Sequence, residues 1–262
     1  MEDIAFENIT FQYPGTDSVL FQNFSLTLSQ GITAFVGQNG TGKTTLLLLA
    51  AGILLPDTGK VYLQGIDTAQ LQGEQQRQCY VSFIFQNMEF ETEETIQTLL
   101  YTVYANGFRK EKDDGLINTL IQEFELEPCL LKKTQEVSKG ELQRTILAFS
   151  LLYGARVIML DEPIFAMEEY QKHKALEFIT AFTKKEHISM YYAVHELDIS
   201  QKYSDYTLLF QKHAPPVYGP TSEVLTRKNL EKAYEAPLIF LKQKETIYRD
   251  TLRGTSRKHN LN

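Results

Sequence analysis

The stretch that decides the fold of this chain is residues 37–45, which read Gly37-Gln38-Asn39-Gly40-Thr41-Gly42-Lys43-Thr44-Thr45. An apolar run at residues 32–36 precedes it, and a second apolar run at residues 46–51 follows it directly. A strand, a glycine-rich loop and a helix in this order are the context in which the pattern G-x-x-x-x-G-K-[ST] binds phosphate. The sequence therefore predicts a phosphate-binding loop, and the alternative is a glycine-rich turn before a core helix.

The residue types in this loop suit a nucleoside triphosphate. Glycines allow backbone N–H groups to turn toward an anion, and the N-terminus of the following helix adds partial positive charge. We expect Lys43 to reach the outer phosphates and the Thr44 hydroxyl to hold a Mg²⁺ ion that bridges them. The residues expected to bind the nucleotide in this loop are Gly37, Asn39, Gly40, Thr41, Gly42, Lys43, Thr44 and Thr45.

The composition is that of an ordinary globular protein. The 262 residues are 43% hydrophobic and 23% charged, which suffices to bury a core in one large domain or two modest ones. The net charge of −7 argues against a surface built for nucleic acid, so we expect no nucleic-acid partner. Cys79 and Cys129 lack a paired ligand spacing, which favours free thiols in a reducing cytosol.

No segment of the sequence predicts direct membrane insertion. The N-terminus, Met1-Glu2-Asp3, is acidic and lacks the basic and apolar regions of a signal peptide. The longest apolar run, residues 46–55, is too short to span a bilayer. We therefore expect a cytoplasmic protein that reaches a membrane only through a partner.

Two kinds of strand are expected in the first 87 residues. Apolar and polar residues alternate in two segments between residues 4 and 28, with a shift of phase near Asn8, which predicts half-buried antiparallel strands and a bulge. Residues 56–59 predict a turn before another short strand. A further alternation over residues 81–85 predicts a strand that delivers Gln86 at its end.

The pattern then changes to a helical one. Apolar residues at helical spacing predict two helices before Pro128. Ser138 and Glu141 have the form of a capping box that starts a third helix, and Gly154 is suited to end it. The α/β pattern returns after Gly154. We therefore expect an α/β core over residues 1–87 and 154–220, a helical insertion over 88–153, and a C-terminal extension over 221–262 with a basic end.

Two carboxylates follow the apolar strand predicted at residues 157–160, in the sequence Asp161-Glu162-Pro163. Such a strand end is often only a turn. Downstream of a phosphate loop the catalytic interpretation is favoured, because Asp161 suits a Mg²⁺ shell and Glu162 can polarise a water molecule for attack on the γ-phosphate.

Together these landmarks resemble the ATP-binding cassette (ABC) ATPases over nearly the whole chain. The resemblance implies an α/β fold with a RecA-like P-loop NTPase core, an antiparallel β-subdomain and a helical insertion, using ATP and Mg²⁺. The landmarks occur in the family's order, which is Tyr13, residues 37–45, Gln86, residues 137–141, Asp161-Glu162 and His195.

The resemblance also implies individual roles. Tyr13 matches the aromatic residue that stacks on adenine, Gln86 the glutamine that touches Mg²⁺ or the attacking water, and His195 the histidine that contacts the γ-phosphate. Ser138 and Gly140 match the signature residues that point at a phosphate. Outside this context each has an ordinary interpretation: a packing aromatic, a surface amide, a structural histidine and a helix cap.

The chain departs from the family pattern at two places. The signature reads Val137-Ser138-Lys139-Gly140-Glu141 where the family favours Leu-Ser-Gly-Gly-Gln. Lys139 is tolerable if its φ is negative and its charge faces solvent or phosphate. Glu168 stands where the family has an aspartate that crosses a dimer interface, so its longer side chain puts the coupling between two sites in doubt.

The family's mechanism implies a head-to-tail dimer, either a homodimer or a pseudo-dimer with a second ABC subunit, docked on separate transmembrane permease subunits at the inner face of the membrane. Residues 87–90 are the expected docking surface. The C-terminal segment resembles ATPases that serve iron–siderophore, haem and cobalamin uptake, which favours import of a metal chelate or similar solute. The alternatives are a regulatory cassette with little turnover and a soluble ABC ATPase outside transport.

Overall fold

The architecture consists of two sheets that enclose the helix following the phosphate loop. The computed structural model describes residues 2–71, 73–109 and 113–237. The strands are β1 (Glu2–Phe11), β2 (Phe21–Ser29), β3 (Ile32–Val36), β4 (Thr58–Leu63), β5 (Ile66–Asp67), β6 (Val81–Ile84), β7 (Val157–Asp161), β8 (Ser189–Ala193), β9 (Tyr206–Leu209) and β10 (Val217–Pro220). The helices are α1 (Lys43–Ala50), α2 (Glu74–Gln78), α3 (Ile96–Asn106), α4 (Asp114–Glu123), α5 (Lys139–Tyr153), α6 (Glu169–Lys185), α7 (Leu197–Tyr203), α8 (Thr221–Val224) and α9 (Arg227–Tyr234).

The larger sheet has the strand order β10-β9-β3-β8-β7-β6, and all neighbours except β10 and β9 are parallel. Its central strands β3, β7 and β8 are buried at every position because helices cover one face and the second sheet with α1 covers the other. In β7, Ile158 and Leu160 join the core on the side of α5 and α6, whereas Val157 and Met159 face the core around α1. This arrangement confirms the predicted α/β fold.

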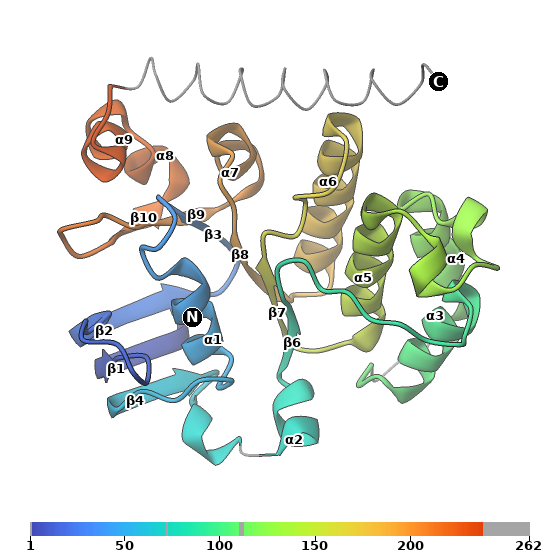
Figure 1. The fold of residues 1–262 in the computed structure, drawn as a ribbon, viewed down its shortest axis with the longest axis horizontal. Helices are drawn as coiled ribbons and strands as arrows, with labels where there is room; N and C mark the ends of the chain where they lie inside the picture. Colours follow the sequence, from blue (N-terminus) through green and yellow to red (C-terminus); the bar gives the residue numbers. More distant parts are fainter. Residues whose placement is uncertain (1, 72, 110–112, 238–262) are drawn as a thin grey trace.

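The smaller sheet is antiparallel, with the order β2-β1-β4-β5, and lies beside α1 (Figure 1). Its strand β1 has a register shift between Phe6 and Ile9, and Asn8 has a φ of 48° there, which confirms the predicted bulge. Helix α1 therefore packs between the two sheets.

The predicted turn at residues 56–59 is partly wrong, because Thr58 and Gly59 already belong to β4. Gly59 has a φ of 83°, and a Cβ atom added to it would lie 2.5 Å from the carbonyl oxygens of Glu7 and Asn8. The glycine thus permits close approach of β4 to the bulge in β1 rather than forming a turn.

Helices α3, α4 and α5 gather on the side of the larger sheet away from the antiparallel sheet (Figure 1). Ser138 and Glu141 form the predicted capping box at the start of α5, and Gly154 ends it with a φ of 78°. Buried residues of these helices share one core with β7 and α6, so the helical segment is packed against the α/β core. Its bounds at residues 88 and 153 remain a prediction.

The strand predicted over residues 81–85 ends earlier than expected, at Ile84. Val81 and Ile84 are its buried residues, whereas Phe85 is 44% exposed, because the chain leaves the sheet before reaching it.

The C-terminal extension begins with α8 and α9. Strand β10, at the antiparallel edge of the larger sheet, was not predicted. The basic residues predicted at the end of this extension, Arg249, Arg253, Arg257 and Lys258, lie outside the described residues. Across residues 2–71, 73–109 and 113–237, no helix combines the length and the apolar character needed to cross a membrane.

Candidate functional site

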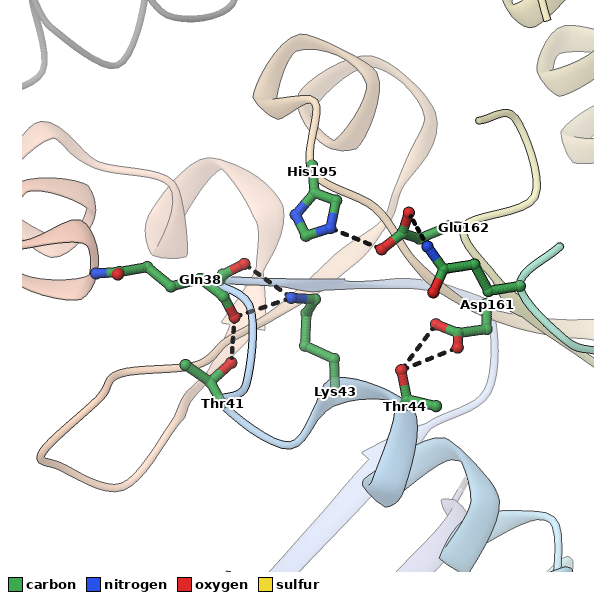
Figure 2. Close-up of polar contacts among 9 residues, drawn as sticks. Gln38, Thr41, Lys43, Thr44, Asp161, Glu162 and His195 are labelled. Atoms are coloured by element: carbon green, nitrogen blue, oxygen red, sulfur yellow. Dashed lines mark hydrogen bonds and ion pairs between the residues drawn. The ribbon is translucent and has the colours of Figure 1, made fainter. Parts of the chain in front are cut away.

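The predicted site residues meet at the carboxyl edge of the larger sheet. The phosphate loop follows β3, Gln86 follows β6, Asp161 ends β7, and His195 follows β8. Because these four strands are parallel, their carboxyl ends lie along one edge, which is where open α/β sheets bind ligands. Figure 2 shows Lys43, Thr44, Asp161, Glu162 and His195 converging there.

The phosphate loop is curled around the Lys43 ammonium group. Lys43 Nζ donates to the carbonyl oxygens of Gly37 and Gln38, at 2.9 and 3.0 Å, and Thr41 Oγ1 donates to the Gln38 carbonyl at 2.8 Å (Figure 2). Gly37 has a φ of 150°, and a Cβ there would lie 2.8 Å from Phe210 Cβ. Glycine is therefore required at this position, both because of the positive φ and because Phe210, directly after β9, leaves no room for a side chain.

Lys43 is buried, and its burial lowers its pKa to about 8, because desolvation disfavours the ammonium form. The carboxylates of Glu162 and Asp161 oppose this effect and hold the pKa up. A phosphate group would add negative charge beside the same ammonium. The loop thus holds the Lys43 ammonium group where a bound phosphate would stabilise its positive charge.

Thr44 and Asp161 lie in contact across the edge of the sheet. Thr44 Oγ1 lies 2.9 Å from Asp161 Oδ2 and 3.1 Å from Asp161 Oδ1 (Figure 2). Burial raises the pKa of the Asp161 carboxyl, with the Thr44 hydrogen bond opposing the shift. A hydroxyl and a carboxylate held together offer the hard oxygen ligands that Mg²⁺ prefers, so these residues fit the ion.

Glu162 is held from two sides. His195 Nε2 donates to Glu162 Oε1 at 2.7 Å, and Gln86 Nε2 donates to Glu162 Oε2 at 2.8 Å. The hydrogen bond from His195 is the main cause of a lowered Glu162 pKa, and burial opposes it. Each carboxylate oxygen has a second lone pair, so an ionised Glu162 can still accept a hydrogen bond from a water molecule.

The backbone at Glu162 is also unusual, with a φ of 50° in the left-handed region. A non-glycine residue in this region carries strain, and such residues cluster at functional sites. Its N–H donates to the carbonyl of Ala193 at 3.1 Å, which ties the turn after β7 to the end of β8. The turn aims the Glu162 side chain at His195.

Tyr13 lies beside the start of α1 rather than in the core. Its hydroxyl shares a hydrogen bond of 3.0 Å with Thr45 Oγ1, and its ring meets the ring of Phe11 edge-on at a centroid distance of 5.0 Å. The residue is 39% exposed. Part of its surface is therefore accessible next to the phosphate loop. Asn39 and Gly40 are exposed in the same loop.

Ser138 and Gly140 do not join the other predicted residues. Ser138 Oγ accepts from the Glu141 N–H at 3.2 Å, and Glu141 Oε2 accepts from the Ser138 N–H at 2.8 Å. A Cβ on Gly140 would lie 2.9 Å from the Ala166 carbonyl oxygen. Among the residues that the structure describes, no hydrogen bond links Ser138 or Gly140 to residues 37–45.

The two departures from the family pattern are both exposed. Lys139 is the first residue of α5 and has helical backbone geometry, and its Nζ forms an ion pair of 2.9 Å with Glu89 Oε1. Glu168 is the N-cap of α6, and its side chain makes no cap hydrogen bond.

Comparison with known families agrees with this geometry. The family model described as "ABC transporter" matches residues 21–165, which is more than half of the chain. The chain belongs to the ABC transporter family. As a member of that family it is an ATPase that uses ATP with Mg²⁺, and its place in a transporter is that of the ATP-binding subunit.

Curated relatives of this ABC ATPase include two from Bacillus subtilis. The petrobactin import ATP-binding protein YclP is 25% identical over 236 residues, covering 88% of this chain and 92% of YclP. The uncharacterised ABC transporter ATP-binding protein YvrA is 30% identical over 234 residues, covering 86% of this chain and 52% of YvrA. The chain thus spans nearly all of one relative and about half of the other.

Among solved structures, the ABC fold of this chain is similar to the dimeric post-hydrolysis state of the ATP-binding cassette MJ0796 bound to ADP and Pi. The TM-score is 0.73 at 17% identity, and the match covers 83% of this chain and 98% of the other. At this identity the similarity establishes the fold, which confirms the predicted cassette architecture.

Several contacts of this ABC site were not predicted. The Gln38 carbonyl accepts from Lys43, and its side-chain Nε2 donates to the Ala233 carbonyl of α9 at 3.0 Å. Lys172 Nζ lies 2.6 Å from Glu196 Oε1, next to His195. In the sequence, Glu196 stands out as a charged residue directly after His195. The residues around Glu196 do not indicate that its partner is Lys172.

Proposed function

We propose that this chain powers an ABC importer by hydrolysing ATP in a head-to-tail dimer, docked on separate membrane subunits. The observation that carries the proposal is the position of Glu162, whose carboxylate is held by His195 and Gln86 and whose pKa is lowered mainly by the hydrogen bond from His195. A carboxylate so placed beside the phosphate loop can act as the base toward a water molecule.

The roles of the site residues follow from their contacts. Lys43 would supply positive charge to the outer phosphates, and the backbone N–H groups of Gly40 in the loop and of Gly42, the N-cap of α1, would donate to the remaining phosphate oxygens. Thr44, Asp161 and Gln86 would hold Mg²⁺, which would neutralise phosphate charge. Glu162 would accept a proton from the attacking water, and His195, which fixes the Glu162 carboxylate, would contact the γ-phosphate of a bound nucleotide.

Dimerisation is proposed because Ser138 and Gly140 lie apart from the loop of their own chain. Both are at the N-terminus of α5, a helix of 15 residues whose dipole favours an anion. In a head-to-tail pair these residues close the ATP site of the partner. The dimeric MJ0796 cassette, which is similar to this chain in fold, supports this arrangement.

Import rather than export is proposed from the relatives. YclP is named as a petrobactin import protein. The C-terminal sequence of this chain, as described above, resembles that of ATPases of metal-chelate uptake. We propose a metal chelate or similar small solute as cargo and the inner face of the cell membrane as the location. The permease would dock beside the segment after β6, where Phe85 and Met88 are exposed.

The proposal is tested with Glu162→Gln, which removes the base but keeps the size of the side chain. Size-exclusion chromatography with light scattering should show a monomer without nucleotide and a dimer with ATP and Mg²⁺. Lys43→Ala is the matched control and should stay monomeric with ATP. A Glu162→Gln protein that binds ATP without dimerising would refute the dimer mechanism, and wild-type ATPase activity that survives Lys43→Ala would refute the site.

A further inference from the structure

The His195 loop is fixed by an ion pair that lies outside the nucleotide site. Lys172, in the first turn of α6, is only 8% exposed, and its Nζ lies 2.6 Å from Glu196 Oε1. The same ammonium lies 3.8 Å from Glu169 Oε2. A buried lysine requires such partners, because an unpaired ammonium is costly to desolvate.

Glu196 is the residue directly after His195 and the N-cap of α7. Its side chain does not cap the helix, and its carbonyl accepts from the Ser200 N–H and Oγ at 3.2 and 3.1 Å. The carboxylate is therefore directed to Lys172 instead of the helix end. This side chain ties the backbone that carries His195 to α6, and the far end of α7 is joined to the same helix by the hydrogen bond of 2.9 Å between His173 Nδ1 and the Tyr203 hydroxyl.

The pair closes a ring that includes the catalytic carboxylate. Glu162 contacts His195 directly through a hydrogen bond. Along the chain, Glu162 is followed by residues 163–168 and then by α6, which contains Lys172. The N–H of Lys172 donates to the Glu168 carbonyl at 2.9 Å, so the base of α6 moves with Glu168. The segment after Glu162 and the segment after His195 are thus joined twice, by the Glu162–His195 hydrogen bond and by the Lys172–Glu196 ion pair.

We propose that Lys172 is a positioning residue that holds the His195 loop against Glu162 through its ion pair with Glu196. The inference rests on the proposed role of His195 in ATP hydrolysis. Lys172 touches neither the nucleotide site nor His195 itself, so its effect passes through Glu196. Without the ammonium group, the Glu196 carboxylate would lose its ion-pair partner, whereas Glu169 would keep the contact of 3.4 Å between its Oε1 and His173 Nε2, and the loop would move to place Glu196 in water.

The kinetic test compares variants of one helix. Lys172→Met should lower kcat about tenfold with KM for ATP changed less than about twofold, because positioning of the reacting groups rather than binding is lost. Lys172→Arg, which keeps the charge, should restore most of the rate. The control is Lys184→Met on the same helix, whose pair with Asp205 at 2.8 Å is exposed and should leave kcat unchanged.

A double-mutant cycle separates positioning from general stability. Lys172→Met should have little further effect on the residual rate of a His195→Ala protein, because the group it positions is gone. An equal fold-loss in both backgrounds would overturn the proposal. If Lys172→Met does not fold, Glu196→Gln breaks the charge pair from the other side and is subject to the same cycle.

A measurement without activity provides an independent readout. The protein is labelled with ¹⁵N in the histidine rings, and its NMR spectrum is recorded. The His195 signal is assigned as the one that is absent from the spectrum of His195→Ala. That signal should shift in Lys172→Met and stay in place in Lys184→Met. An unshifted signal in Lys172→Met would overturn the proposal even if ATP hydrolysis proved to follow another route, whereas loss of the proposed function alone would leave this result intact.

Discussion

Thr44 and Asp161 are 117 positions apart in the sequence, yet Thr44 Oγ1 lies within 3.1 Å of both carboxylate oxygens of Asp161. Thr44 belongs to α1 and Asp161 ends β7, and α1 packs against β7 in the core between the two sheets. The contact brings a hydroxyl and a carboxylate to one point beside the phosphate loop. It is the basis of the proposed Mg²⁺ site.

Thr44→Val should raise the free Mg²⁺ concentration needed for half-maximal ATPase activity by about tenfold, equivalent to about 1.4 kcal/mol. The change removes the hydroxyl while keeping a β-branched side chain of similar size. Thr41→Val is the control in the same loop, because the Thr41 hydroxyl donates to the Gln38 carbonyl at 2.8 Å and not to Asp161. Equal Mg²⁺ requirements in the two variants would contradict the assignment of Thr44 to the ion.

ATP affinity should fall as the pH rises above about 8, the pKa of Lys43 in the folded chain. The ammonium form binds phosphate, so above this pH a proton must be taken up on binding, and Kd rises about tenfold for each pH unit. Calorimetry at pH 7 and pH 9 in buffers of different ionisation enthalpy would measure this uptake. Lys43→Met should bind weakly and without this pH dependence.

The same shift has a consequence for stability. Burial lowers the pKa of Lys43 from 10.5 to about 8, so the folded state disfavours its charged form. The resulting destabilisation is fully present below pH 8 and disappears as the pH rises through the unfolded value of 10.5. The free energy of unfolding of wild type relative to Lys43→Met should therefore increase between pH 8 and pH 10.

Ser138→Ala should destabilise the fold by about 1 kcal/mol, because it removes the cap of α5. Thr95→Ala is the matched control, since Thr95 caps α3 through the Thr98 N–H and lies outside the proposed dimer site. Urea denaturation should give similar losses for the two variants. In the Glu162→Gln background, only Ser138→Ala should also weaken the ATP-dependent dimer. If Ser138→Ala and Thr95→Ala dimerise equally well, Ser138 acts only as a helix cap.

Glu168→Asp should stabilise the protein by about 1 kcal/mol. Glu168 is the N-cap of α6 and forms no cap hydrogen bond, whereas the shorter aspartate is among the residues preferred at this position. Glu168→Ala, which removes the carboxylate, should bring no such gain. A thermal or urea denaturation series on the three proteins would test this, and equal stability of the Asp and Ala variants would show that no new cap forms.

The sequence was a good guide wherever a pattern covered neighbouring residues. The bulge at Asn8, the capping box at Ser138 and the end of α5 at Gly154 all depend on a few adjacent side chains and were predicted correctly. The turn at residues 56–59 and the strand through Phe85 were misjudged. In both cases the outcome depends on a partner strand, since β4 extends to meet the bulge in β1, and the chain leaves the sheet before Phe85.

The phosphate loop at residues 37–45 was determined by the sequence alone, because a tight turn before a helix is specified by glycines and by the residues directly beside them. Only the tertiary structure decided which side chains surround it. Glu162 meets His195 because the parallel strands β7 and β8 end at the same edge of one sheet, and Lys172 meets Glu196 because α6, which follows β7, packs beside the segment that follows β8. Such contacts depend on the order of strands in the sheet, which no local pattern of residues records.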